Sequence, residues 1–358
     1  MNTLPINLIQ RFLQGALVLV VLSGCSTGQM VVRGSQSIMD SSMETMNRET
    51  DLILARDSMP ANLKMIEGML VEDPGNTEMR LYAAQGFYGY AFGFIELEDP
   101  QRASQLYRRC YDHARKALSH TGVKLDPEHS SPADFEAAVG QAGKRAVPAL
   151  FWTASCLSNW INLNRDSPAG IAELSSAATM MRRVLELDET FYHGGAHMFF
   201  GVYYGGFSPM FGGDFEKSAH HFERAAEING DRLLLVDVLY AEYLARQRLD
   251  QAAFRSRLTR VIEAPADLYP EMALRAESAP VRKASAIRTA WGGRGIFESR
   301  RAPRAPLQNT PRDDGAVGRK ITMKRTVSIL ALAAMAATSA MSSAGTPSSL
   351  RVPPRFSM

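Results

Sequence analysis

Residues 193–226 read HGGAHMFFGVYYGGFSPMFGGDFEKSAHHFERAA. In the first half of this stretch, aromatic side chains recur at helical spacing and alternate with glycine: Phe199, Phe200, Tyr203, Tyr204 and Phe207, with Gly201, Gly205 and Gly206. Each glycine inside a helix costs about 1 kcal/mol relative to alanine. The pattern therefore predicts that a second helix, or a ligand, lies close against this backbone.

The helix cannot continue through the next residues. Pro209 has no backbone N–H to donate, and the pair Gly212-Gly213 favours a turn. Asp214 then offers a capping carboxylate for a second helix. That helix has one apolar face, at Phe215, Ala219, Phe222 and Ala226. We expect a helical hairpin, and we call the segment Pro209–Gly213 between its helices the elbow.

The amino terminus has the pattern of an export signal. Arg11 precedes an apolar run over residues 12–22, and the run ends in Leu22-Ser23-Gly24-Cys25, which resembles the lipobox of bacterial lipoproteins. We predict a signal peptide over residues 1–24, lipidation of Cys25 and a tether over residues 25–37. Ser26 favours the outer membrane by the same resemblance. The alternative is an ordinary signal peptide with a chance cysteine.

Length and composition predict one large folded domain behind this anchor, which we place at residues 38–290. The net charge of +3 is close to balance, so nothing in the sequence requires a nucleic acid partner. Cys110 and Cys156 are exposed to an oxidising compartment and can form a disulfide. Because both lie among apolar helical residues, we predict buried thiols instead.

From Ser37 to about Leu274 the sequence predicts a succession of helices and no strands. Three pairs place a capping side chain before proline at the first helical position: Asp99-Pro100, Ser131-Pro132 and Ser167-Pro168. Asp73-Pro74-Gly75-Asn76 predicts a turn between two helices. The fold class that these signals predict is all-α.

The helices also repeat at the spacing of a tetratricopeptide (TPR) repeat, in which small residues let paired helices touch. One copy is Phe87, Tyr90, Ala91, Phe94, Ala103, Tyr107 and Cys110. A second copy is His197, Phe200, Gly201 and Tyr204, then Ser218, Phe222 and Ala225, and Tyr240-Ala241 with Leu244 is a weaker one. We therefore expect a degenerate TPR-like α-solenoid of helical hairpins that is compact.

Signals for chemistry are weak. His193 and His197 are four residues apart and would share a helix face, which is metal-ligand spacing, but no third ligand accompanies them. We predict structural roles for both, and a solvated face for His220-His221. No Gly-x-Ser-x-Gly motif or phosphate-binding loop is present in the sequence. We predict no catalytic residue, no metal and no cofactor.

Aromatic residues provide the candidate binding site. Trp152 and Asn159 are seven apart on a helix, with Trp160 beside them, and would form a lining for a ligand with one polar end. Tyr203 and Tyr204 are further candidates, although packing between repeats explains most such residues. The elbow, at Pro209, Met210, Phe211, Gly212 and Gly213, is the candidate partner contact, since an exposed Met-Phe pair indicates a partner.

Five segments share a pattern with a known family: the lipobox, Tyr82–Ala91, Glu98–Ala103, the elbow with Gly212-Gly213-Asp214, and Asp267–Leu274. Through them the chain resembles the TatT-type lipoproteins, which contain TPR repeats and are periplasmic partners of tripartite ATP-independent periplasmic (TRAP) transporters. The resemblance covers roughly residues 22–274. It implies an all-helical subunit that can trimerise, association with the extracytoplasmic solute-binding protein, and handling of an apolar ligand.

The carboxyl-terminal residues do not continue this pattern. Proline, glycine and arginine dominate after Leu274, and we predict a disordered tail over residues 291–358. Residues 323–344 resemble a second signal peptide. We interpret the tail as the product of a frameshift or fusion with a downstream gene.

Three functions remain open at this point. The first is a non-enzymatic lipoprotein, anchored in the outer membrane and facing the periplasm, that binds the solute-binding protein of a TRAP transporter and assists uptake. The second is a TPR scaffold for outer-membrane or cell-wall assembly. The third is a metalloenzyme built on His193 and His197.

Overall fold

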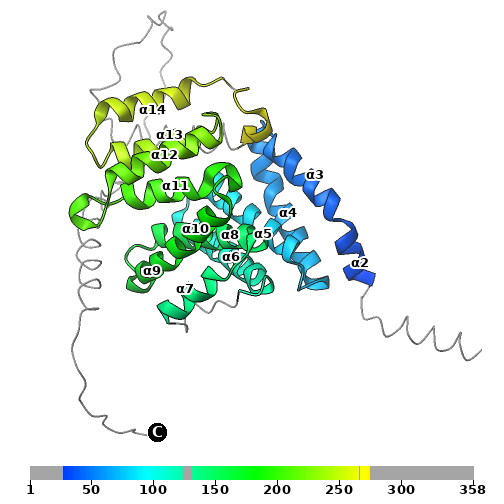
Figure 1. Ribbon diagram of the computed structural model, residues 1–358. Coiled ribbons are helices and arrows are strands. Elements are labelled where there is room, and N and C mark those ends of the chain that lie inside the picture. The colour runs from blue at the N-terminus through cyan, green and yellow to red at the C-terminus, as the bar shows by residue number, and fades with distance from the viewer. Residues whose placement is uncertain (1–26, 124–130, 266, 275–358) are drawn as a thin grey trace, which may run out of the picture. The chain divides into compact units, whose positions relative to one another are not determined.

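The computed structural model describes residues 27–123, 131–265 and 267–274 (Figure 1). These ranges contain helices and turns and no strand, so the predicted all-α fold class is confirmed. No helix in the described ranges is long and apolar enough to cross a bilayer. The predicted signal peptide and lipobox, residues 275–290, the tail from residue 291 and the segment 323–344 lie outside them.

The described residues divide into two compact units by their internal contacts. Unit 1 takes residues 27–160 and 269–274, and unit 2 takes residues 161–268. The helices of unit 1 are α2 (Thr27–Gly34), α3 (Gln36–Asn47), α4 (Leu52–Glu72), α5 (Thr77–Tyr90), η1 (Ala91–Ile95), α6 (Pro100–His120), α7 (Pro132–Gly140), η2 (Lys144–Ala146), most of α8 (Val147–Leu163) and η5 (Pro270–Met272). Each unit is described by itself below.

Unit 1 begins with helix where the sequence predicted a tether. Residues 27–34 form α2, and α3 begins at Gln36. Two contacts hold α2 on the body: Val32 is buried, and the Arg33 guanidinium pairs with Asp73 at 2.9 Å. The prediction was wrong over this segment because glycine and serine composition does not reveal an ion-pair partner 40 residues away.

The local signals for turns and caps are confirmed. Asn76 follows α4 and caps α5 by accepting a hydrogen bond from the backbone N–H of Met79 in its first turn. Asp99 caps α6, Ser131 caps α7, and Ser167 accepts from the backbone of Gly170 in the short helix α9 (Pro168–Ala172). Each side chain satisfies an N–H that the helix leaves without a partner.

The α5–α6 hairpin buries every residue of the first TPR-spaced copy. Between its helices lies η1, a π-helical turn in which the Glu96 N–H donates to the Ala91 carbonyl at 2.8 Å. The Tyr107 hydroxyl donates to Glu96 at 2.5 Å and so ties this turn to α6. The predicted spacing thus identifies the faces on which these helices pack, while TPR identity itself stays a prediction.

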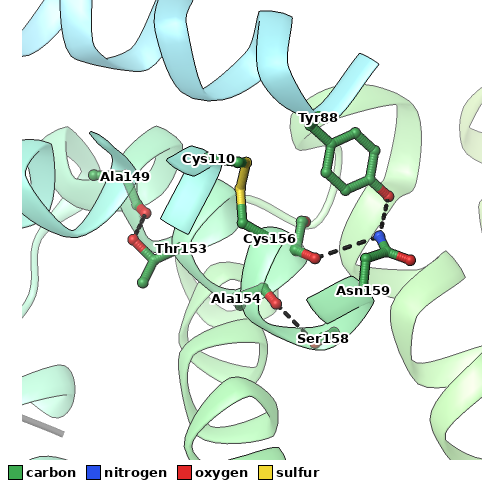
Figure 2. The surroundings of a disulfide bond; sticks show 9 residues. Tyr88, Cys110, Ala149, Thr153, Ala154, Cys156, Ser158 and Asn159 are labelled. Carbon is green, nitrogen blue, oxygen red and sulfur yellow. Dashed lines mark hydrogen bonds between the residues drawn. A yellow bond between two sulfur atoms is a disulfide. The ribbon is translucent and has the colours of Figure 1, made fainter. Parts of the chain in front are cut away.

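The two cysteines correct a prediction. Cys110 in α6 and Cys156 in α8 form a disulfide, with Cα atoms 5.7 Å apart (Figure 2). Both residues are fully buried, as expected, but they are not thiols. Apolar neighbours indicate burial and say nothing of whether two buried cysteines face each other; that depends on the packing of α6 against α8.

Removing this bridge is expected to destabilise unit 1. The disulfide closes a loop of 46 residues, for which loop-closure entropy predicts a stabilisation of about 4 kcal/mol at most. Chemical denaturation of the Cys110→Ala/Cys156→Ala protein should show this loss relative to the parent. Mass spectrometry of the alkylated, unreduced parent that finds two free thiols would contradict the assignment.

Unit 2 contains α9, α10 (Leu174–Asp188), α11 (Phe191–Gly205), η3 (Pro209–Phe211), α12 (Phe215–Ile228), α13 (Leu235–Leu239), η4 (Tyr240–Ala245) and α14 (Gln251–Glu263). Its second hairpin repeats the plan of α5–α6. A helix, α13, runs into a π-helical turn, η4, and Asp250 caps the returning helix α14. A buried cluster holds this hairpin together: Leu234, Val238, Ala241, Ala245, Phe254, Leu258 and Val261.

Candidate partner-binding elbow and its hairpin

The start of α11 is not regular helix. Tyr192, His193 and Gly194 have left-handed dihedrals, with φ of 52°, 60° and 77°, so the right-handed helix begins at Gly195. His193 therefore does not share a helix face with His197, and the predicted metal-ligand spacing was wrong. The sequence gives no warning of this, because two of the three residues are not glycine.

The predicted close approach in the hairpin is confirmed, and the partner is α12. A Cβ on Gly201 would lie 2.7 Å from ring atoms of Phe222. The Ser218 hydroxyl donates to the Gly201 carbonyl at 2.7 Å in the buried contact between the helices. Ser218, Phe222 and Ala225 are the buried residues of α12, so the TPR spacing located the contact face more accurately than the apolar run from Phe215.

Gly201→Ala is expected to lower the free energy of unfolding by about 1–3 kcal/mol, since the new methyl group overpacks against Phe222. Gly68→Ala is the matched control, because Gly68 lies inside α4 and a Cβ there would meet nothing within 4 Å. It should be neutral or stabilising by up to about 1 kcal/mol. Equal denaturation midpoints for the two variants would contradict the close contact.

The elbow leaves α11 and returns to α12 through a short 3₁₀ turn, η3. Gly212 has φ of 88°, and its neighbour Gly213 has no room for a Cβ beside the Phe207 carbonyl. The Gly213 N–H donates to Ser208 at 3.1 Å, and the Asp214 N–H donates to Tyr204 at 2.9 Å. These bonds fix the loop at both ends.

Met210 is at the exposed tip of this loop. Its side chain is 84% exposed, more than any other large apolar side chain among the described residues. Beyond the tip, Asp214 caps α12 by accepting from the backbone N–H of Lys217 at 3.0 Å, as predicted. Lys217 also lowers the pKa of the Asp214 carboxyl. A fixed loop that exposes a large apolar side chain is suited to contact another molecule.

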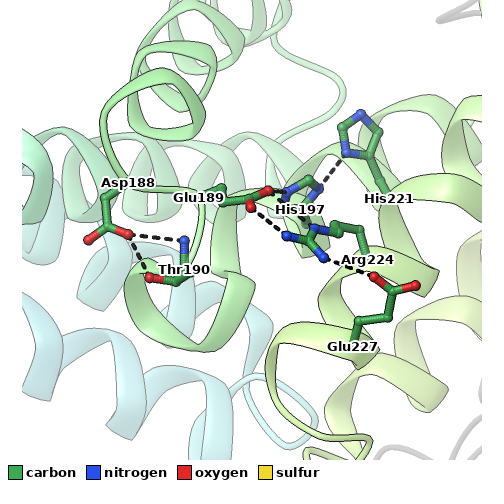
Figure 3. Close-up of polar contacts among 7 residues, drawn as sticks. All are labelled: Asp188, Glu189, Thr190, His197, His221, Arg224 and Glu227. Atoms are coloured by element: carbon green, nitrogen blue, oxygen red, sulfur yellow. Dashed lines mark hydrogen bonds and ion pairs between the residues drawn. The ribbon is translucent and has the colours of Figure 1, made fainter.

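A polar network links the two helices of the same hairpin, from the buried His197 to the partly exposed Glu189 and Arg224 (Figure 3). His197 of α11 is buried and lies 2.9 Å from His221 of α12, Nδ1 to Nδ1. The other ring nitrogen of His197 lies 3.1 Å from Glu189, and Glu189 pairs with Arg224. His220 is exposed, but His221 stacks on Phe200 and Tyr204. The predicted solvated face was therefore wrong for His221.

The protonation states of the network follow from its geometry. Hydrogen bonds from Arg224 and His197 lower the pKa of Glu189 to about 2, so this carboxylate is ionised and accepts. His197 then donates to Glu189 through Nε2, and neutral His197 accepts from the His221 Nδ1–H. Burial, with His197 and His220 nearby, lowers the pKa of His221 to about 4. Both rings are neutral at neutral pH.

This network predicts a pH dependence of stability. Because the native pKa of His221, about 4, lies below the ordinary value of 6.5, the unfolded chain binds the proton first as the pH falls. The free energy of unfolding should therefore fall between about pH 6.5 and 4. In His221→Asn, the amide replaces the Nδ1–H donor without titrating. Between about pH 7 and 5, the melting temperature of this variant should fall less than that of the parent. Glu189 keeps its charge throughout this window, because its pKa is about 2.

His220→Asn is the matched control, since His220 is exposed on the same helix. This variant should keep the slope of the parent. If the melting temperatures of the parent, His221→Asn and His220→Asn fall by the same amount over this pH range, the assignment of a neutral His221 is contradicted.

The other candidates of unit 2, Tyr203 and Tyr204, are half-buried on α11. Tyr203 stacks on Phe199, and burial raises the pKa of its hydroxyl. Tyr204 lies under Lys217, whose Nζ is 5.4 Å from the ring centroid. Tyr203 therefore packs along α11, and Tyr204 packs against the first turns of α12.

The candidates of unit 1 gather around Tyr88, a residue that the sequence did not single out. Trp152 is buried and meets Tyr88 edge to face, with centroids 5.4 Å apart. The Asn159 amide donates to the Tyr88 hydroxyl at 2.7 Å (Figure 2). Trp160 lies beside them under the Arg108 guanidinium. Trp152 and Asn159 thus both contact Tyr88, a partner in α5 that the spacing of α8 alone could not reveal. Their role as a ligand lining stays a prediction.

Sequence reasoning also missed Glu189 and Arg224, which lie 35 residues apart and meet only in the fold. Among the described residues, no three histidine, cysteine or acidic side chains are grouped as a metal ion would require. The described residues thus place an exposed apolar side chain at Met210 and a packed group of aromatic and polar side chains around Tyr88 and Asn159.

Comparison with known proteins identifies the family. No curated protein matches the chain. The family model described as TAtT, the TRAP transporter T-component, matches residues 48–290, which is more than half of the chain and includes the α5–α6, α11–α12 and α13–α14 hairpins and the elbow. This family is a component associated with transport and is not an enzyme family. The chain belongs to the TAtT family of TRAP transporter T-components.

Proposed function

We propose that this T-component is a periplasmic lipoprotein, anchored in the outer membrane through Cys25, that binds the solute-binding protein of its TRAP transporter. Binding brings the solute-binding protein to the site of uptake. The family match supports a role in TRAP transport. Trimerisation, which the resemblance implies, belongs to the same proposal.

The exposed Met210 at the tip of the elbow is the observation that carries the proposal. A methionine adapts its shape to a partner surface, because its side chain is unbranched and polarizable. Backbone hydrogen bonds and the Asp214 cap hold the loop before a partner arrives. Little conformational entropy is then lost on binding, which favours affinity.

The proposal includes an apolar ligand with one polar end, held by unit 1. The group around Tyr88 supports this part, since the half-buried Tyr88 and Asn159 place aromatic and polar atoms together over the buried Trp152. Aromatic walls with a few placed polar groups are typical of small-molecule sites. Mass spectrometry of small molecules extracted from the purified protein tests this part.

The elbow is tested by replacing Pro209, Met210 and Phe211 with Ser, and by Met210→Ser alone. Both proteins should bind the solute-binding protein of the same transport system at least about tenfold more weakly, as loss of a central apolar anchor does. Because Met210 is exposed, Met210→Ser should change the melting temperature by less than about 2 °C. Calorimetry and thermal unfolding give the two quantities.

Leu249→Ser is the matched control, since Leu249 is another exposed apolar residue of unit 2 and lies before α14. This variant should bind like the parent. Intact binding by Met210→Ser, or equal weakening in both variants, would remove the elbow from the interface.

A further inference from the structure

Helix α2, the first in the described residues, and the end of α4 expose apolar side chains that nothing in the described chain covers. Val31 in α2 is 71% exposed, and Val71 in the last turn of α4 is 77% exposed. Met30, beside Val31, is exposed as well. These residues lie at the end of the described chain that is closest in sequence to the predicted lipidation site, Cys25.

A shallow apolar groove of about 460 Å³ lies between the two helices. We call it the α2–α4 groove, and it is lined by Thr27, Gly28, Val31, Val32, Gly68, Met69 and Glu72. Thr27 and Glu72 are its polar lining, and the remainder is apolar or glycine. A groove of this composition fits the region where lipid headgroups meet acyl chains.

The helix that carries Val31 is fixed to the body of unit 1. Val32 is buried, and Arg33 forms an ion pair with the buried carboxylate of Asp73. The guanidinium holds the pKa of Asp73 below its ordinary value, so the pair is charged at neutral pH. The groove therefore keeps its position when the residues before Thr27 are attached to a membrane.

Chain geometry places the groove at the bilayer. Cys25 and Thr27 are two residues apart, so their Cα atoms are at most about 7–8 Å apart. The glyceride of a lipidated cysteine lies at headgroup level, and α2, with eight residues, is about 12 Å long. Without a tether between Cys25 and the body, the exposed side chains of α2 are held within the thickness of the interfacial layer.

We propose that the α2–α4 groove, with Met30, Val31 and Val71, is a docking face for the lipid bilayer next to the anchor. The inference rests on the proposed lipidation of Cys25 and goes beyond it, because it assigns an orientation to unit 1. The apolar side chains enter the interface, and Arg33, with a side chain 60% exposed, lies at the level of lipid phosphates. In this orientation, unit 1 contacts the membrane through α2 and the end of α4.

The face is tested with an environment-sensitive fluorophore on single introduced cysteines in the full-length acylated protein. Val31→Cys and Val71→Cys report on the face. Ile53→Cys is the matched control, since Ile53 is 74% exposed and lies in the first turn of the same helix α4, about 27 Å from Val71. The proteins are bound to vesicles of phosphatidylethanolamine and phosphatidylglycerol that carry a nitroxide-labelled lipid.

The label at positions 31 and 71 should shift to the blue and be quenched several-fold more strongly than the label at position 53. Melting temperatures close to that of the parent confirm that each variant is folded. Equal, solvent-like signals at all three positions of vesicle-bound protein would overturn the docking face and leave the anchor intact. A blue shift at position 71 without vesicles, growing with protein concentration, would assign the face to a second copy of the chain and overturn the proposal.

The anchor is checked separately. Cys25→Ala protein should stay in the supernatant when vesicles are pelleted, and the parent should pellet with them. A parent that stays in the supernatant would overturn the anchor and, with it, the docking face.

Discussion

The contact between the backbone of α11 at Gly201 and the ring of Phe222 in α12 determines the geometry of the hairpin that carries the elbow. Because glycine has no Cβ, the two helices approach closely enough for the Ser218 hydroxyl to reach a backbone carbonyl of α11. The His197–His221 hydrogen bond depends on the same separation. The short elbow can join the helices without distortion only because their ends are already close.

Structural features that depend on only a few neighbouring residues could be predicted from the sequence. Asp99, Ser131 and Asp214 each cap a helix whose first turn contains their partner N–H, so neighbouring residues decide the outcome. The TPR spacing predicted the buried face of α12 for a related reason, since Ser218, Phe222 and Ala225 repeat the small and large residues that paired helices need.

Features that depend on two distant segments could not be predicted. Cys110 and Cys156 meet because α6 packs on α8, and Tyr88 meets Asn159 because α5 does likewise. Each residue alone shows only that it belongs to an apolar helix face. The prediction that His193 shares a helix face with His197 failed for a local reason. Left-handed dihedrals at non-glycine residues are rare, and the surrounding packing must impose them.

The return of the chain to unit 1 constrains the order of folding during synthesis. Tyr269, Met272 and Leu274 are buried in unit 1, and η5 contacts α3. These residues leave the ribosome more than two hundred residues after α3, whereas the described residues of unit 2 are all made before them. Unit 2 can therefore fold while unit 1 still exposes the apolar surface that η5 covers. Until Leu274 has been made, unit 1 exposes this apolar surface to proteases and to non-native contacts, and among the described residues those of η5 and Leu274 are the last to pack.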